Sequence, residues 1–162
     1  MGMSYKQSKG DNLYRRSLYT IWKRTVAPPT LAVFDSADRE ACWVNRKETN
    51  TPLQALTLLN ETGYVDAARH LAERILREGG DAPLEFAFRL VLSRDPTPDE
   101  LSVLTKAIDS YRADFKARPE AAKEMLTAGA SPPSSGFPAS ELAAWTTLAN
   151  VLLNLDETIT RK

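Results

Sequence analysis

The chain has 162 residues, 43% of them hydrophobic and 26% charged, which is the balance of a folded protein long enough to form a core without disulfides or metals. Lysine plus arginine and aspartate plus glutamate both number 21, so no net field attracts nucleic acid or an anionic membrane. The single cysteine, Cys42, excludes an internal disulfide, and no apolar run is long enough to span a membrane.

The first third of the chain begins with a polar segment, 1–11, which we interpret as a linker or as residues left from cloning; no secretory signal is visible in it. One helical domain is expected from residue 12 to 162. Its first helix is predicted over about 12–25, because residues at spacings of three and four form one face: Leu13, Tyr14, Ser17, Leu18, Ile21 and Trp22. Pro28 and Pro29 end this helix, and Pro29 and Thr30 are expected to open a short turn through 31–34.

The segment 35–50 loses helical periodicity and is dense in charge. Irregular connections of this length are usually functional or packed over the body of a fold. Cys42, next to Trp43, is typical of a small buried residue, although the nearby Arg39 and Arg46 leave a reactive thiol as an alternative.

Helix start and stop signals become clear after residue 50. Thr51-Pro52-Leu53-Gln54 and Thr97-Pro98-Asp99-Glu100 are capping boxes with proline at the first helical position. A break is expected at 60–63, and the following helix ends at Gly79-Gly80. Asp81 is predicted to cap the next helix, whose apolar run 84–92 predicts the core helix of the domain.

The second capping box predicts a long amphipathic helix that ends before Pro119, which starts a short helix to about residue 128. Glycine, proline and serine over 129–138 predict a flexible loop. The last helix is expected over about 139–158 and carries Trp145 on its apolar stripe. The sequence therefore predicts an all-α fold, a compact multi-helix domain with one long irregular segment and one proline- and serine-rich loop.

Polar and aromatic side chains gather in the first third of the chain. They make a candidate interface or polar network of Arg15, Arg16, Trp22, Arg24, Asp35, Asp38, Arg39, Trp43, Arg46, Asn50, Gln54 and Asn60. Cations interleaved with aromatic rings could form a nucleic-acid surface. Acidic residues lie among the cations, however, so the charge pattern favours a structural network that ties the irregular segment to the helices.

Catalytic and cofactor motifs are absent from the sequence. The only histidine, His70, lies on a charged helical face and is typical of a solvated surface residue, and no second histidine could complete a metal site. No glycine-rich phosphate loop and no C-x-x-C-H haem motif occurs. We therefore predict no catalytic, cofactor-binding or metal-binding residue and no cofactor.

Four blocks of sequence together carry a resemblance: R-R-S-L-Y-T at 15–20, Phe34-Asp35 with Asp38-Arg39-Glu40, T-N-T-P-L-Q-A-L at 49–56, and the segment 141–157. In these blocks the chain resembles the planctomycete-specific C-terminal domain, a family of unknown function. The resemblance implies an extracytoplasmic location at the end of a large exported protein, which often also carries a cytochrome-c-like domain and a second uncharacterised domain. It implies no reaction and no functional residue.

The leading hypothesis is a non-catalytic structural or interaction module whose partners are other domains of its parent protein or a polysaccharide, without nucleic-acid binding or membrane insertion. The alternative is part of an enzyme, related to polysaccharide or redox chemistry, whose site is completed by neighbouring domains. In that alternative Asp38, Arg39 and Asn50 contribute polar groups. Buried, mutually satisfied polar residues would favour the first hypothesis, and their convergence on an open cleft would favour the second.

Overall fold

The computed structural model describes residues 5–6, 8, 10, 12, 15–23, 26–37, 42, 44, 49–133 and 135–160. Regular structure within these residues is helical, apart from one isolated antiparallel bridge between Lys23 and Val26, which confirms the all-α fold class. The chain divides into two compact units, unit 1 at residues 1–57 and unit 2 at 58–162. The single domain over 12–162 stays a prediction.

Unit 1 contains only short regular elements among its described residues. They are a 3-10 helix, η2 (Ser17–Tyr19), helix α1 (Pro29–Val33) and the start of α2 (Pro52–Asn60). α1 begins at a proline, as expected, because proline is pre-shaped for the first helical position. The capping box of α2 is confirmed: the Thr51 N–H donates to Gln54 Oε1 at 2.9 Å, and the Gln54 N–H donates to Thr51 Oγ1 at 3.3 Å.

The helix predicted over 12–25 is wrong. Of the residues described in that range, 15–16 and 20–23 are not helical, η2 is a three-residue 3-10 helix, and the chain then forms the bridge between Lys23 and Val26. The side chains of Leu18 and Ile21, which define the predicted apolar face, are 76% and 74% exposed. A short helix depends on burying its apolar face, so periodicity without a partner for that face does not produce a helix.

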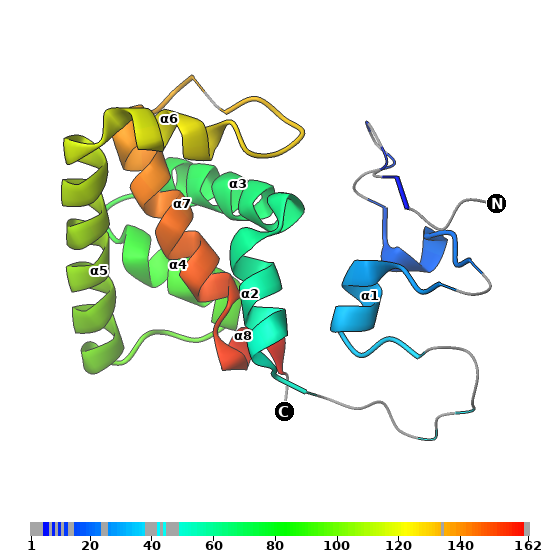
Figure 1. Cartoon of the computed structure of the whole chain (residues 1–162). Coiled ribbons are helices and arrows are strands. Elements are labelled where there is room, and N and C mark those ends of the chain that lie inside the picture. The colour runs from blue at the N-terminus through cyan, green and yellow to red at the C-terminus, as the bar shows by residue number, and fades with distance from the viewer. Residues whose placement is uncertain are drawn as a thin grey trace. The chain divides into compact units, whose positions relative to one another are not determined.

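Unit 2 is a bundle of longer helices. They are α3 (Thr62–Glu78), α4 (Pro83–Leu92), α5 (Pro98–Ala117), α6 (Pro119–Leu126), α7 (Ala139–Leu153) and α8 (Asp156–Ile159). Figure 1 shows α7 in the middle of this unit, with α5 on one side and α3 on the other. The break at 60–63 is confirmed, because Glu61 separates α2 from α3. Its side chain caps α3 by accepting the Gly63 and Tyr64 N–H groups.

Two local expectations in unit 2 are wrong. Asp81 does not cap α4, because Ala82 is the N-cap residue and Pro83 opens the helix. The last helix ends at Leu153 instead of continuing to residue 158, and α8 follows as a separate turn. The end of α3 next to Gly79-Gly80 and the capping box of α5 agree with the sequence.

The apolar run 84–92 predicts α4 as the core helix of unit 2, and this prediction is wrong. The core helix is α7. α7 packs against α3, α4, α5, α6 and α8. Small residues let its neighbours approach closely, and large ones fill the space between them; its buried residues are Leu142, Ala143, Ala144, Trp145, Thr146, Leu148, Ala149, Asn150 and Leu152. α4 buries only Ala87 and Phe88 among its described residues.

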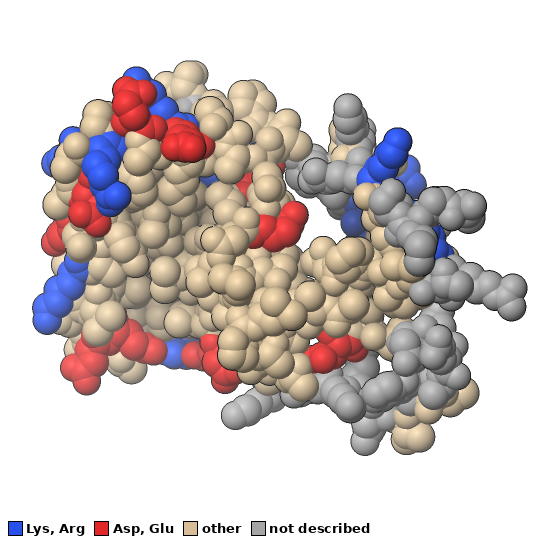
Figure 2. Space-filling view, viewed as in Figure 1, with Lys and Arg blue, Asp and Glu red and all other residues tan. Residues whose placement is uncertain are grey.

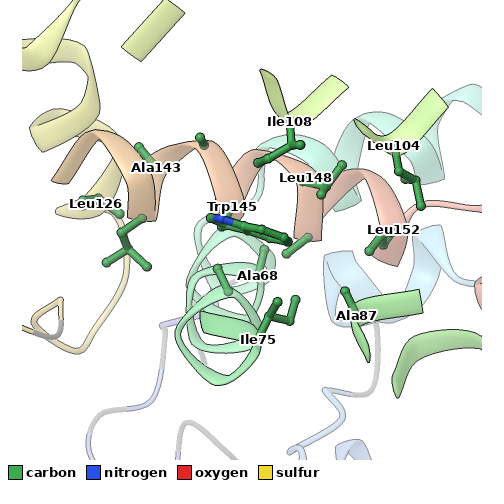
Figure 3. Packing of buried hydrophobic residues seen from close by; sticks show 14 of the residues in the cluster. Ala68, Ile75, Ala87, Leu104, Ile108, Leu126, Ala143, Trp145, Leu148 and Leu152 are labelled. Carbon is green, nitrogen blue, oxygen red and sulfur yellow. The ribbon is translucent and has the colours of Figure 1, made fainter. Parts of the chain in front are cut away.

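Trp145 is the largest fully buried side chain of the core, with 1% of its surface exposed. Figure 3 shows its ring between Ile108 of α5 and the α3 residues Ala68 and Ile75. Its indole N–H donates to Glu141 Oε1 at 2.8 Å, so burial of the ring leaves no unpaired donor there.

Arg94, in the α4–α5 connection, binds side chains of both α5 and α8 in unit 2. Its guanidinium donates to both Glu100 oxygens, at 3.0 and 2.8 Å, and to both Glu157 oxygens, at 2.8 and 2.7 Å. The hydrogen bonds from Arg94, followed by the one from the Thr97 backbone, lower the pKa of Glu100 to about 2. The same guanidinium lowers the pKa of Glu157.

Trp145→Ala is expected to lower the free energy of unfolding by about 3–5 kcal/mol, because the truncation leaves a cavity between α3, α5 and α7. Urea denaturation followed by circular dichroism measures the change. Val151→Ala is the matched control, since Val151 lies on the same helix but is 36% exposed. Equal losses in the two variants would contradict the central position of the tryptophan.

Glu100→Gln is expected to reduce the loss of stability on acidification. A carboxyl group whose folded-state pKa is lowered stabilises the fold above its unfolded value near 4.5, and this contribution disappears as the pH falls toward about 2. Thermal unfolding of both proteins between pH 5 and pH 2 tests this. Glu120→Gln, which changes an exposed carboxylate paired with Lys123, should leave the wild-type pH profile unchanged.

Candidate functional site

A hydrogen-bond network in unit 1 centres on Gln54, in the first turn of α2. Its side chain is 1% exposed. The Nε2 amide group lies 2.9 Å from the Val33 carbonyl oxygen, 3.2 Å from Asp35 Oδ2 and 3.1 Å from Thr49 Oγ1. Because Oε1 accepts the Thr51 N–H, one buried amide connects α1, the irregular segment and α2.

Asp35 is the second centre of this network. Its Oδ2 accepts the Thr49 N–H at 3.1 Å and the Thr49 hydroxyl at 2.5 Å. Its φ of 54° lies in the left-handed region, which aspartate tolerates better than most residues. The two ends of the segment 35–50 are therefore held together, and both are held to α2.

The other predicted site residues do not join this network in any hydrogen bond described. Arg15 and Arg16 are exposed beside η2, Trp22 is half-buried, and Asn50 and Asn60 are exposed with contacts of their own. Asn60 belongs to unit 2. The remaining predicted residues, Arg24, Asp38, Arg39, Trp43 and Arg46, lie outside the described residues.

Exposed apolar side chains follow Arg15 and Arg16 directly. Leu18, Tyr19 and Ile21 are 76%, 66% and 74% exposed. The chain on either side is anchored within unit 1, because the Tyr5 hydroxyl donates to the Val26 carbonyl oxygen at 2.6 Å and accepts the Lys23 N–H at 3.0 Å. We call residues 15–21 the arginine-flanked apolar stretch, and it gives unit 1 an apolar surface bordered by positive charge.

A buried charge cluster in unit 2 was not predicted from the sequence. Arg69 of α3 is 1% exposed and pairs with Asp66 and Glu73, one turn before and after it on the helix. The same guanidinium donates to the backbone carbonyl oxygens of Ser131, at 3.0 Å, and Pro132, at 3.3 Å. The loop 129–138, predicted as flexible, is thus fixed to α3 at its first residues.

A glycine allows this loop to approach α3 so closely. Gly129 has a φ of 115°, and a β-carbon built on it would lie 2.4 Å from Asp66 Cγ. Asp66 also accepts the Ala130 N–H at 3.3 Å. In the sequence, Asp66 and Glu73, three and four residues from Arg69, have the spacing of an ordinary exposed helical face. Gly129, at the start of a loop, is the one sequence signal of the contact between this loop and α3.

An open pocket of about 230 Å³ lies elsewhere in unit 2, between α4, α5 and α7. Its polar lining includes Arg112, which donates to both oxygens of Glu141. This pairing lowers the pKa of Glu141 and raises the pKa of Arg112. Arg112 is therefore occupied by a residue of its own protein.

Neither a metal-holding cluster nor a membrane-spanning helix occurs among the described residues. No group of three or more histidine, cysteine, aspartate or glutamate side chains there is arranged to hold a metal ion. Cys42 is exposed, so its interpretation as a small buried residue is wrong. Among the helices described, none combines the length and apolar character needed to cross a bilayer. Figure 2 shows acidic and basic side chains intermixed over unit 2 on the face in view.

Gln54→Ala is expected to destabilise unit 1 by about 1–3 kcal/mol, because it removes the buried amide and leaves the half-buried Val33 and Asp35 acceptors and the Thr51 N–H without this partner. Amide hydrogen exchange of Thr49 and Thr51 should accelerate. Thr57→Ala is a control on the same helix, since its hydroxyl bonds the Leu53 carbonyl oxygen within the helix. Unchanged exchange at both threonines in Gln54→Ala would contradict the role of the network.

Comparison with protein families gives a match over residues 2–108 to PSD1, described as a protein of unknown function (DUF1553). The match covers unit 1 from residue 2, α3, α4 and part of α5, and therefore includes the segment 2–11 that was interpreted as a linker. The block of resemblance at 141–157 lies outside it. No curated protein and no solved structure matches the chain. Because the family model covers more than half of its residues, the chain belongs to the PSD1 family of unknown function (DUF1553).

Proposed function

We propose that the chain is an interaction module of a larger exported protein and that the arginine-flanked apolar stretch is its binding surface. The observation that carries this proposal is the exposure of Leu18, Tyr19 and Ile21 within four consecutive positions of unit 1. Three large apolar side chains placed so closely on a surface lose water when a partner covers them, which favours association.

The composition of the stretch also supports a protein partner. Tyrosine and arginine are enriched at the centres of protein interfaces, where a ring supplies contact area and a guanidinium supplies several hydrogen bonds. Arg15 and Arg16 are exposed next to the apolar side chains. The partner that fits is therefore an apolar patch bordered by carboxylates.

The Gln54 network supports the same function in a different way. It holds α1, Asp35 and Thr49 to α2 through a buried amide, so these residues act as scaffold. The hydrogen bond between the buried Gln54 side chain and the half-buried Asp35 side chain supports the structural interpretation. The enzyme alternative depends on Asp38, Arg39 and Asn50; Asp38 and Arg39 lie outside the described residues, and Asn50 is exposed.

The resemblance to the planctomycete-specific C-terminal domain suggests where the partner is found. In this proposal the module works outside the cytoplasm, and its partner is another domain of the same polypeptide, such as a cytochrome-c-like domain or a second uncharacterised domain. Binding within one polypeptide needs only modest intrinsic affinity, because the linkage raises the effective concentration.

Ile21→Glu is expected to weaken binding to the neighbouring domains of the parent polypeptide about 30-fold, as for a central interface residue worth about 2 kcal/mol. Surface plasmon resonance with separately expressed neighbouring domains measures the affinity. Val103→Glu is the control, because Val103 is 65% exposed on α5 of unit 2. The proposal fails if wild-type protein binds none of these domains or if the two variants bind equally.

A further inference from the structure

His70 and Ser131 lie 61 positions apart in the sequence, and their side chains meet in unit 2. The distance from His70 Nε2 to Ser131 Oγ is 2.9 Å. The His70 side chain is 49% exposed and Ser131 is half-buried, so molecules from solvent can reach the pair. A serine hydroxyl at hydrogen-bonding distance from an imidazole nitrogen is the first requirement for an activated serine nucleophile.

The two ring nitrogens of His70 have different neighbours: Nε2 lies 3.8 Å from Asp66 Oδ1, and Nδ1 lies 3.7 Å from Glu73 Oε2. Arg69 Nη2 lies 3.5 Å from His70 Nε2, and a guanidinium can only donate. In the tautomer that carries its proton on Nδ1, the Nε2 lone pair is available to the Ser131 hydroxyl 2.9 Å away. Glu73 Oε2 is beyond direct hydrogen-bond range of Nδ1, so this carboxylate acts on the imidazole through its negative charge, which favours a proton on Nδ1.

Arg69 also acts directly on the serine oxygen. Its Nη2 donates to Ser131 Oγ at 2.9 Å, which places a positive charge where negative charge develops when the hydroxyl loses its proton. The two Asp66 oxygens are farther from Ser131 Oγ, at 3.3 and 3.4 Å, so His70 is the nearest acceptor for the proton. The pairing of Arg69 with Asp66 and Glu73 keeps this guanidinium in place.

We propose that Ser131 is a nucleophile for acyl transfer from small esters, with His70 as its base, Glu73 as a positioning residue and Arg69 stabilising the charge. Ser131 Oγ attacks the ester carbonyl carbon while its proton moves to His70 Nε2. The carbon–oxygen bond to the alcohol then breaks, and the alcohol leaves with that proton. Water hydrolyses the acyl-serine by the same route and regenerates Ser131.

This activity goes beyond the proposed interaction function and uses none of its residues. It also departs from the sequence prediction of no catalytic residue, because neither Ser131 nor His70 lies in a motif. Loop 129–133 brings the serine to α3 only through its contacts with Arg69 and Asp66.

The full chain is incubated with a fluorophosphonate probe, which forms a covalent bond with activated serines, and the labelled residue is identified by peptide mass spectrometry. Labelling at Ser131 is expected in the wild type and absent in Ser131→Ala. His70→Gln should label at least about 100-fold more slowly, because proton transfer contributes about that factor or more. Ser135→Ala, which removes an exposed hydroxyl from the same loop, should label at the wild-type rate.

Hydrolysis of 4-nitrophenyl acetate separates the serine from the imidazole acting alone. Loss of turnover in Ser131→Ala, with a far-ultraviolet circular dichroism spectrum and melting temperature equal to those of Ser135→Ala, supports the proposal. Three results would overturn it: no labelling of the folded protein above that of heat-denatured protein, equal labelling of His70→Gln and wild type, or ester hydrolysis that persists in Ser131→Ala.

Discussion

The burial of α7 on nearly every side is the constraint on which unit 2 depends. A helix in this position can face its neighbours only with apolar or small side chains, and each polar group it carries needs a partner. Thr146 donates back to the Leu142 carbonyl oxygen, and Asn150 donates to the Leu59 carbonyl oxygen at the end of α2. Trp145 fixes the spacing between α3 and α5, because its ring fills the space between them and its indole N–H bonds Glu141. The other helices of the unit are arranged around this one element.

Polar contacts then decide where the connections between these helices lie. Arg94 binds α5 and α8 from the α4–α5 connection, and Arg69 binds the loop after α6 from inside the cluster on α3. The two arginines differ in their exposure to solvent. Arg94 is partly exposed, whereas Arg69 is buried and requires both of its acids, since an unpaired charge in that position would be strongly destabilising. The site proposed at Ser131 depends on the buried Arg69, because its guanidinium binds the loop backbone and also contacts the serine oxygen.

Unit 1 is stabilised in a different way. Its described elements are short, and a buried amide at Gln54 joins the backbone of α1 to Asp35 and Thr49. This arrangement leaves a row of large apolar side chains at 18–21 in contact with water. An apolar surface of this kind, bordered by two arginines, is what an interaction module needs. The PSD1 family match includes both this stretch and the Gln54 network, since it extends from residue 2 to residue 108.

The sequence by itself determined those features that depend on a few adjacent residues: the capping boxes at Thr51 and Thr97, the proline starts of α1, α5 and α6, the stop at Gly79, and the all-α class. These are local because a cap or a proline satisfies or removes hydrogen bonds within one turn. Tertiary structure alone decided which apolar faces find a partner, so the residues described within 12–25 form no α-helix despite their periodicity, and α7 instead of α4 became the core. It also decided the meeting of Arg69, His70 and Ser131. Charged residues spaced three and four apart give the same sequence pattern whether a loop or water covers them. Only the folded chain brings His70 and Ser131, 61 positions apart, within hydrogen-bonding distance.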